Sequence, residues 1–116
     1  MNKVVLITGG ARGIGSAIAL ELAKHGYDIV INYLTSKQPA KELKEKIESQ
    51  YHVRCLTICA DVSDVDQVNI MVSEIEEKMG GVDILINNAA VDLSNLFHLK
   101  NAEEFKRTLD VNVVGA

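Results

Sequence analysis

The 116-residue sequence has little of several residue types that mark particular classes of protein, with one proline, two cysteines and no tryptophan. Its apolar runs are far shorter than the ~20 residues needed to cross a bilayer, and no charged-then-apolar leader opens it. Lysine and arginine form no cluster, and the net charge is −4, which argues against nucleic acid or an anionic membrane as the main partner. We therefore expect a soluble cytoplasmic protein.

The scarce cysteines and histidines predict neither a redox site nor a metal site. Cys55 and Cys59 lie on a predicted strand, where residues four apart share a face but are ~13 Å apart, beyond disulfide reach. His25, His52 and His98 are scattered, with no Asp, Glu or Cys at ligand spacing. We expect the cysteines to pack in the interior of a protein from a reducing compartment.

The chain is organised around the turn Thr8-Gly9-Gly10-Ala11-Arg12-Gly13-Ile14-Gly15. It follows the apolar run 4–7 and opens an amphipathic segment over 16–25, which predicts a strand, a tight turn and a helix. Backbone N–H groups and the helix dipole favour an anion in front of such a turn. The spacing is neither the G-x-G-x-x-G fingerprint nor a P-loop, so two interpretations stay open. The turn either holds the diphosphate of a dinucleotide or only lets helix pack on sheet.

Strands and helices alternate along the rest of the chain. Apolar runs predict strands at 29–33, 53–60 and 82–86, and a helix is predicted at about 39–50. Another helix is capped by Ser63 and carries a stripe made of Val65, Val68, Val72, Ile75 and Met79. A last helix begins near Asn101.

Nearly continuous apolar strands are typical of a parallel sheet that helices cover on both faces. We therefore predict an α/β fold with a doubly wound Rossmann sheet of strand order 3-2-1-4. It forms one domain, residues 1–116, which we expect to be truncated at its C-terminus, since only a loop and an unfinished helix follow the fourth strand.

Polar residues stand at the carboxyl ends of the strands, where ligands bind in open α/β sheets. Asp61-Val62 follows the third strand and suits an adenine, although a helix-capping Asp is the alternative. Asn87-Asn88 either ties strand ends together or lines a ligand, and we expect one residue to do each. Asn112, a poor helix former on the last predicted helix, either faces solvent by chance or is placed for function.

Together these motifs resemble the short-chain dehydrogenase/reductase family, and within it the 3-oxoacyl-[acyl-carrier-protein] reductases, from Val4 to Gly115. The family's T-G-x-x-x-G-I-G stands at Thr8–Gly15 and its D-V at Asp61-Val62. Its N-N-A-G stands at 87–90 with alanine in place of glycine, and its N-V/L-x-G-like helix at 112–115. The resemblance implies nicotinamide coenzyme chemistry on a carbonyl or alcohol.

The resemblance also implies a role for each matching residue. The residues that would hold the diphosphate and the adenosine ribose are Gly9, Gly10, Ala11, Arg12 and Ile14. Those that would contact the adenine are Asp61 and Val62. Those that would line the ribose beside the nicotinamide are Asn88, Ala89 and Ala90. Asn87 would bridge strands, and Asn112 would be catalytic through a main-chain carbonyl that holds a water in the proton relay and locally disturbs its helix.

The coenzyme preference is predicted from charge. An NAD site places an acidic residue ~20 residues past the glycine turn, and the position at or beside Tyr33 is not acidic, while Asp28 lies at the wrong end of its strand. Arg12 and the segment Thr35–Lys37 offer charge and hydroxyls for a phosphate, unless Arg12 is an ordinary solvated arginine. We therefore assign Tyr33 and Thr35 to the coenzyme site and predict NADP(H).

These expectations describe an NADP(H)-dependent carbonyl reductase that converts a small-molecule or acyl-carrier-bound 3-oxoacyl thioester to the 3-hydroxyacyl thioester. The family's catalytic Ser and Tyr-x-x-x-Lys have no counterpart at a suitable place in this sequence. Tyr33 and Lys37 have the spacing of the Tyr-x-x-x-Lys motif, but we expect them to lie far from the nicotinamide end. We expect this chain alone to be inactive and to form a homo-oligomer, with association or partial disorder near its C-terminus. The alternatives are a non-catalytic nucleotide-binding module and a dehydrogenase acting on a sugar, a steroid or another alcohol.

Overall fold

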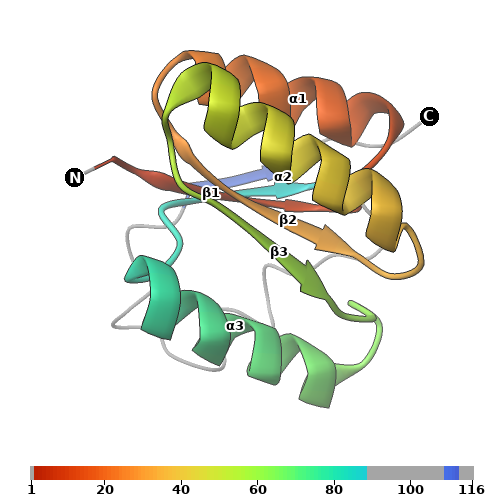
Figure 1. Ribbon diagram of the computed structural model, residues 1–116. Helices are drawn as coiled ribbons and strands as arrows, with labels where there is room; N and C mark the ends of the chain where they lie inside the picture. The colour runs from red at the N-terminus through yellow and green to blue at the C-terminus, as the bar shows by residue number, and fades with distance from the viewer. Residues whose placement is uncertain (1, 89–108, 113–116) are drawn as a thin grey trace.

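The computed structural model describes residues 2–88 and 109–112. In chain order the elements are β1 (Val4–Thr8), α1 (Gly13–Lys24), β2 (Asp28–Tyr33), α2 (Lys37–Tyr51), β3 (Cys55–Cys59), α3 (Val65–Met79), β4 (Ile84–Asn87) and β5 (Leu109–Asn112). The strands form one parallel sheet in the order β3-β2-β1-β4-β5 (Figure 1). The doubly wound Rossmann sheet and the order 3-2-1-4 of its first strands are therefore confirmed.

Helices cover both faces of the sheet, α1 and α2 one face and α3 the other (Figure 1). Successive side chains of a strand point to opposite faces, so Val4 and Leu6 of β1 pack in the cluster under α3, and Val5 and Ile7 in the cluster under α1 and α2. Ala19 of α1 is fully buried there, and its small side chain lets the helix lie close to the strands. This packing holds the carboxyl ends of the strands at one edge of the sheet.

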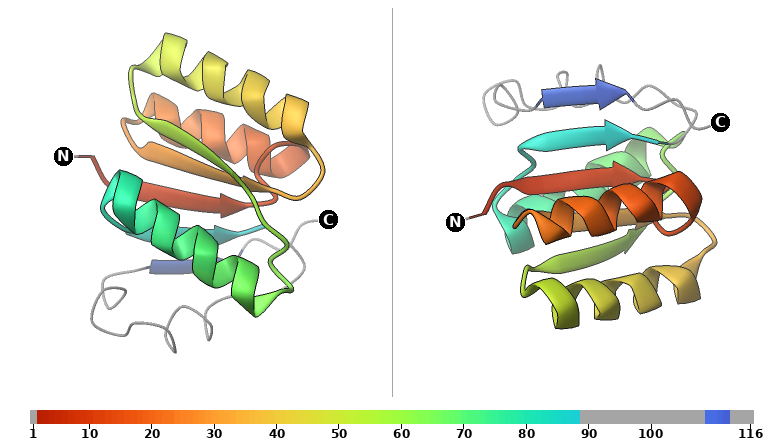
Figure 2. Two further views of the ribbon diagram at one scale, coloured as in Figure 1. Left: turned by 60° about the horizontal axis from the view of Figure 1, so that its bottom comes forward. Right: turned by 90° about the horizontal axis from the view of Figure 1, so that it is seen from above.

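Strand β5 replaces the helix predicted at this place. Leu109–Asn112 pairs in parallel with β4, with Asn112 opposite Asn87 (Figure 2). The sequence here alternates apolar and polar residues, Val111 is β-branched, and the edge of β4 offers backbone groups for pairing. The helical prediction over 109–112 is wrong. The rest of the predicted helix, residues 101–108 and 113–116, lies outside the described residues.

Two details of α3 also differ from the prediction. Its N-cap is Asp64, whose carboxylate accepts from the N–H groups of Asp66 and Gln67, and not Ser63. Val65 is 51% exposed, and the buried apolar face of the helix includes Met71 instead. The register is set by packing against the sheet, which periodicity alone does not specify.

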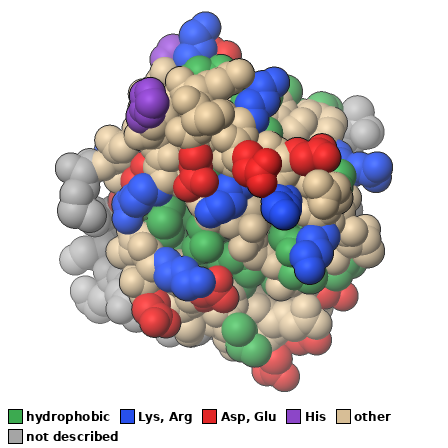
Figure 3. Space-filling view, in the orientation of Figure 1, with side chains coloured by type: hydrophobic (Ala, Val, Ile, Leu, Met, Phe, Trp, Pro, Cys, Tyr) green, Lys and Arg blue, Asp and Glu red, His purple; other side chains and the backbone are tan. Residues whose placement is uncertain are grey.

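Charged side chains of both signs lie on the face of the molecule that Figure 3 shows. On the face in Figure 3, Lys and Arg side chains lie interspersed with Asp and Glu, and no region of one sign stands out. Among the helices of residues 2–88, none is long and apolar enough to span a membrane.

Candidate functional site

The predicted site residues leave the sheet at one edge. Because β1 to β4 are parallel, the segments that follow their last residues, Thr8, Tyr33, Cys59 and Asn87, all emerge on the same side. The arrowheads in Figure 1 mark this edge. The structure thus brings together the glycine turn, Tyr33 with Thr35, Asp61-Val62 and Asn88.

The glycine turn has the geometry of an anion site. Gly9 adopts φ 62°, a left-handed conformation that favours glycine. At Gly15 a Cβ atom would lie 2.7 Å from the Gly9 carbonyl oxygen and 2.8 Å from Asn88 Nδ2, so only glycine lets α1 begin this close to the turn. The N–H groups of Gly13, Ile14 and Gly15 have no acceptor within the described part of the chain. No acidic side chain occupies the first turn of α1.

Arg12 and Ile14 flank these N–H groups at the surface. Arg12 is the N-cap residue in an extended conformation, and its side chain makes no capping bond. Ile14 is 47% exposed. Gly10 and Ala11 are buried behind them. The exposed Arg12 leaves its guanidinium available to a ligand at the start of the helix.

Thr8 and the two asparagines join the ends of β1 and β4. Thr8 Oγ1 donates to Asn87 Oδ1 at 3.0 Å and accepts the Asn88 N–H at 3.0 Å, so Asn87 bridges the strands as predicted. Asn88 Nδ2 donates to the Gly9 carbonyl oxygen at 3.1 Å, and Asn88 Oδ1 is buried without a partner among the described residues. A buried acceptor of this kind suits a donor that is not part of this segment.

Asp61 makes hydrogen bonds through its side-chain carboxylate and through its backbone N–H. Its Oδ1 accepts the Ser63 hydroxyl at 2.6 Å and the Ser63 N–H at 2.9 Å, and these bonds lower the pKa of the carboxyl group. Its own N–H donates to Gln67 Oε1 at 2.8 Å. The N–H of the next residue, Val62, has no acceptor within residues 2–88. Asp61 does not cap α3, since Asp64 does, and the contact of Asp61 with an adenine stays a prediction.

The residues assigned to the coenzyme phosphate lie at the end of β2 and in the segment that follows it. Tyr33 is half-buried and Thr35 is exposed. Tyr33 and its neighbour Asn32 occupy the place where an acidic residue would mark an NAD site, and neither is acidic.

Asn32 is a residue of the site that the sequence reasoning passed over. It is 3% exposed, and its side chain bonds both the glycine turn and the residue before Asp61. The sequence does carry a signal for this residue, because Asn32 is the polar residue that directly follows the apolar run Ile29–Ile31, which is buried.

Some predicted residues are not placed in the site. Ala89 and Ala90 lie outside the described residues. Asn112 is described only as backbone of β5, so its predicted part in catalysis, which the family resemblance puts on a helix, stays a prediction. In the part of the chain that the structure describes, no group of three or more His, Cys, Asp or Glu is arranged to hold a metal ion.

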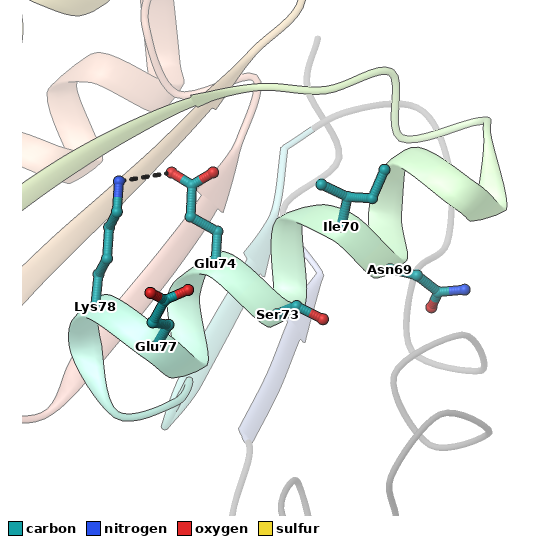
Figure 4. A pocket seen from close by; sticks show the side chains of 6 residues that line it. All are labelled: Asn69, Ile70, Ser73, Glu74, Glu77 and Lys78. Atoms are coloured by element: carbon teal, nitrogen blue, oxygen red, sulfur yellow. Dashed lines mark hydrogen bonds and ion pairs between the residues drawn. The ribbon is translucent and has the colours of Figure 1, made fainter.

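A surface hollow lies elsewhere, along the outer side of α3 (Figure 4). It has a volume of about 500 Å³, and the residues lining it are Asn69, Ile70, Ser73, Glu74, Glu77 and Lys78. Lys78 and Glu74 form an ion pair of 3.2 Å within it. None of these residues belongs to the predicted coenzyme site.

A family model and curated proteins both match this chain over almost its whole length. The model of the short chain dehydrogenase family matches residues 3–116. The 3-oxoacyl-[acyl-carrier-protein] reductase FabG of Staphylococcus aureus strain Mu50 is 38% identical over 115 residues, 99% of this chain and 46% of that protein. The chain thus spans about half the length of the curated relatives it matches.

Solved structures of reductases are also similar to this chain. L-sorbose reductase from Gluconobacter frateurii, complexed with NADPH and L-sorbose, has a TM-score of 0.72 and 36% identity, over 78% of this chain and 34% of that chain. The NADH-dependent reductase A1-R′, complexed with NAD, has a TM-score of 0.71 and 32% identity, over 78% and 37%.

Proposed function

The chain belongs to the short-chain dehydrogenase family, and on that premise we propose that it is the coenzyme-binding part of an NADP(H)-dependent reductase. The substrate we propose is a small-molecule or acyl-carrier-bound 3-oxoacyl thioester, reduced to the 3-hydroxyacyl thioester in fatty acid synthesis by a cytoplasmic homo-oligomer. The similarity to FabG supports this substrate class.

The observation that carries the proposal is the start of α1. The N–H groups of Gly13, Ile14 and Gly15 have no acceptor in the described segments, and no acidic side chain competes for them. A diphosphate satisfies such groups and interacts favourably with the helix dipole. Gly15 keeps the site open, because a Cβ atom there would collide with Gly9 and Asn88.

The other strand ends fit the rest of the coenzyme. The Val62 N–H can donate to a ring nitrogen of adenine, and the Asp61 carboxylate, whose pKa the hydrogen bonds from Ser63 lower, can accept from the exocyclic amino group. Asn88 lies beside Gly9 at the end of β4, on the side where we place the nicotinamide ribose. When bound, the nicotinamide supplies or accepts the hydride.

The preference for NADP(H) rests on charge. Solved relatives include complexes with NADPH and with NAD, so the family alone does not decide it. At this site no carboxylate stands at Asn32 or Tyr33 to repel a 2′-phosphate, and the exposed Arg12 offers a guanidinium to bind one.

The test is calorimetric titration of the chain with NADPH and with NADH. We expect NADPH to bind about tenfold more tightly, and Arg12→Ala to weaken NADPH binding about tenfold with less effect on NADH. Lys24→Ala, which removes an exposed cation at the other end of α1, is the matched control and should leave both affinities unchanged. Absence of heat with both coenzymes contradicts the proposed site, and equal affinities contradict the NADP(H) preference.

A further inference from the structure

One buried side chain joins the two loops to which we assign the diphosphate and the adenine. Asn32 Oδ1 accepts the Gly9 N–H at 3.3 Å, and Asn32 Nδ2 donates to the Ala60 carbonyl oxygen at 3.0 Å. The Asn32 main-chain carbonyl also accepts the Gly10 N–H at 3.0 Å. Gly9 and Gly10 begin the glycine turn after β1, and Ala60 immediately precedes Asp61. A residue on β2 therefore contacts the loops after β1 and after β3.

The chemistry of these bonds calls for a carboxamide. A backbone N–H can only donate and a backbone carbonyl can only accept, so the residue between Gly9 and Ala60 must offer an acceptor to one and a donor to the other. An aspartate would place a second acceptor against the Ala60 carbonyl, and an apolar side chain would remove the partner that Asn32 gives to each group.

The geometry points to Asn32 as a positioning residue for the coenzyme, fixing the separation between the diphosphate loop and the adenine loop. This inference rests on the proposed function. The bond from the Ala60 N–H to the Tyr33 carbonyl oxygen, 2.9 Å, already joins β2 to the end of β3, and the Gly10 bond already joins β2 to the turn. The carboxamide adds a direct link between the two loops, so its loss should affect most a ligand that spans both.

The variants that test this are Asn32→Leu, which has a similar volume and removes both side-chain bonds, and Asn32→Thr, which suits a strand and keeps one polar group. The matched control is Asp28→Asn, a change of a buried polar residue at the opposite end of β2. Circular dichroism establishes a temperature at which every variant is folded. Affinities are then measured for NADPH by calorimetry and for pyrophosphate by NMR shifts of the Gly13 and Gly15 amides.

We expect Asn32→Leu to weaken NADPH binding about tenfold and Asn32→Thr to weaken it less, while pyrophosphate, which needs only the glycine turn, binds within about twofold of wild type. Asp28→Asn should lower the melting temperature without changing either affinity. An unchanged NADPH affinity in Asn32→Leu overturns the inference and leaves the proposed function intact. An equal loss for both ligands also overturns it, because the turn itself would then be damaged. A wild-type chain that binds no NADPH overturns the inference and the proposed function together.

Discussion

Thr8 Oγ1 donates a hydrogen bond to Asn87 Oδ1 at 3.0 Å between residues 79 positions apart in the sequence. The same oxygen accepts the Asn88 N–H, and Thr8 is fully buried. This hydroxyl therefore fixes the ends of β1 and β4 relative to each other, at the point where the glycine turn and Asn88 leave the sheet.

Replacement of Thr8 by valine should reduce the free energy of unfolding by about 2 kcal/mol, because it removes a donor to Asn87 and an acceptor for the Asn88 N–H without changing the volume. Urea denaturation measures the change. Thr8→Ser keeps the hydroxyl and should lose less than half as much. If Thr8→Val is as stable as wild type, the hydroxyl does not carry the effect.

Asp28 makes stability depend on pH. Its carboxylate is 2% exposed and lies 2.7 Å from Arg54 Nη2. Burial raises the pKa of Asp28, but hydrogen bonds from the Arg54 backbone and side chain and from Asn2 outweigh burial, so the pKa is lowered. A lowered pKa in the folded state stabilises the protein above the unfolded value of about 4, and this contribution is lost as the pH falls through the folded pKa.

The Asp28 prediction is tested with Asp28→Asn. The variant should lose about 2 kcal/mol of unfolding free energy at pH 7, and its difference from wild type should shrink as the pH falls below about 4. Glu45→Gln removes a charge from the exposed surface of α2 and should stay within about 0.5 kcal/mol of wild type at both pH values. A constant difference between pH 7 and pH 3 would rule out ionisation of Asp28 as the cause.

The sequence predicts the fold well because its strongest signals are local. The apolar run before Gly9 and the amphipathic segment after Gly15 define a strand, a turn and a helix without tertiary information. Repeated strand-helix units with apolar strands favour parallel pairing. The right-handed crossover from one strand to the next then restricts the order of the strands in the sheet. The same logic places Asp61 and Asn88 at one edge of the sheet.

What the sequence does not predict depends on contacts between distant residues. The helix assigned over 109–112 competes with pairing to β4, and the edge of that strand decides the outcome. Asn32 is an ordinary polar residue in the sequence, and its role emerges only when Gly9 and Ala60 lie on either side of it. The choice of Asp64 over Ser63 as N-cap is instead a local competition, because the Ser63 hydroxyl donates to Asp61 while the Asp64 carboxylate accepts the first N–H groups of α3.

The two cysteines should differ in reactivity. Burial raises the pKa of the Cys55 thiol to about 12. Cys59 is exposed at the end of β3, so the expected packing in the interior holds for Cys55 and is wrong for Cys59. In native chain at pH 8, a thiol reagent such as DTNB should therefore modify Cys59 quickly and Cys55 only in denaturant. Cys59→Ser should abolish the fast reaction. Fast labelling that persists in this variant would mean that β3 opens readily.

Gly15→Ala should disrupt the coenzyme site and stability together. The added Cβ would lie 2.7 Å from the Gly9 carbonyl oxygen, and because that oxygen is backbone, α1 must move away from the turn that its N–H groups serve. We expect NADPH affinity measured by calorimetry to fall at least about tenfold. Gly26→Ala, at the other end of α1, is the control: φ is 91° there but nothing lies within 4 Å of the added atom, so it should lose about 1 kcal/mol of stability through backbone strain and keep its affinity. If both variants bind NADPH equally well, the close approach of Gly15 to Gly9 is not what shapes the site.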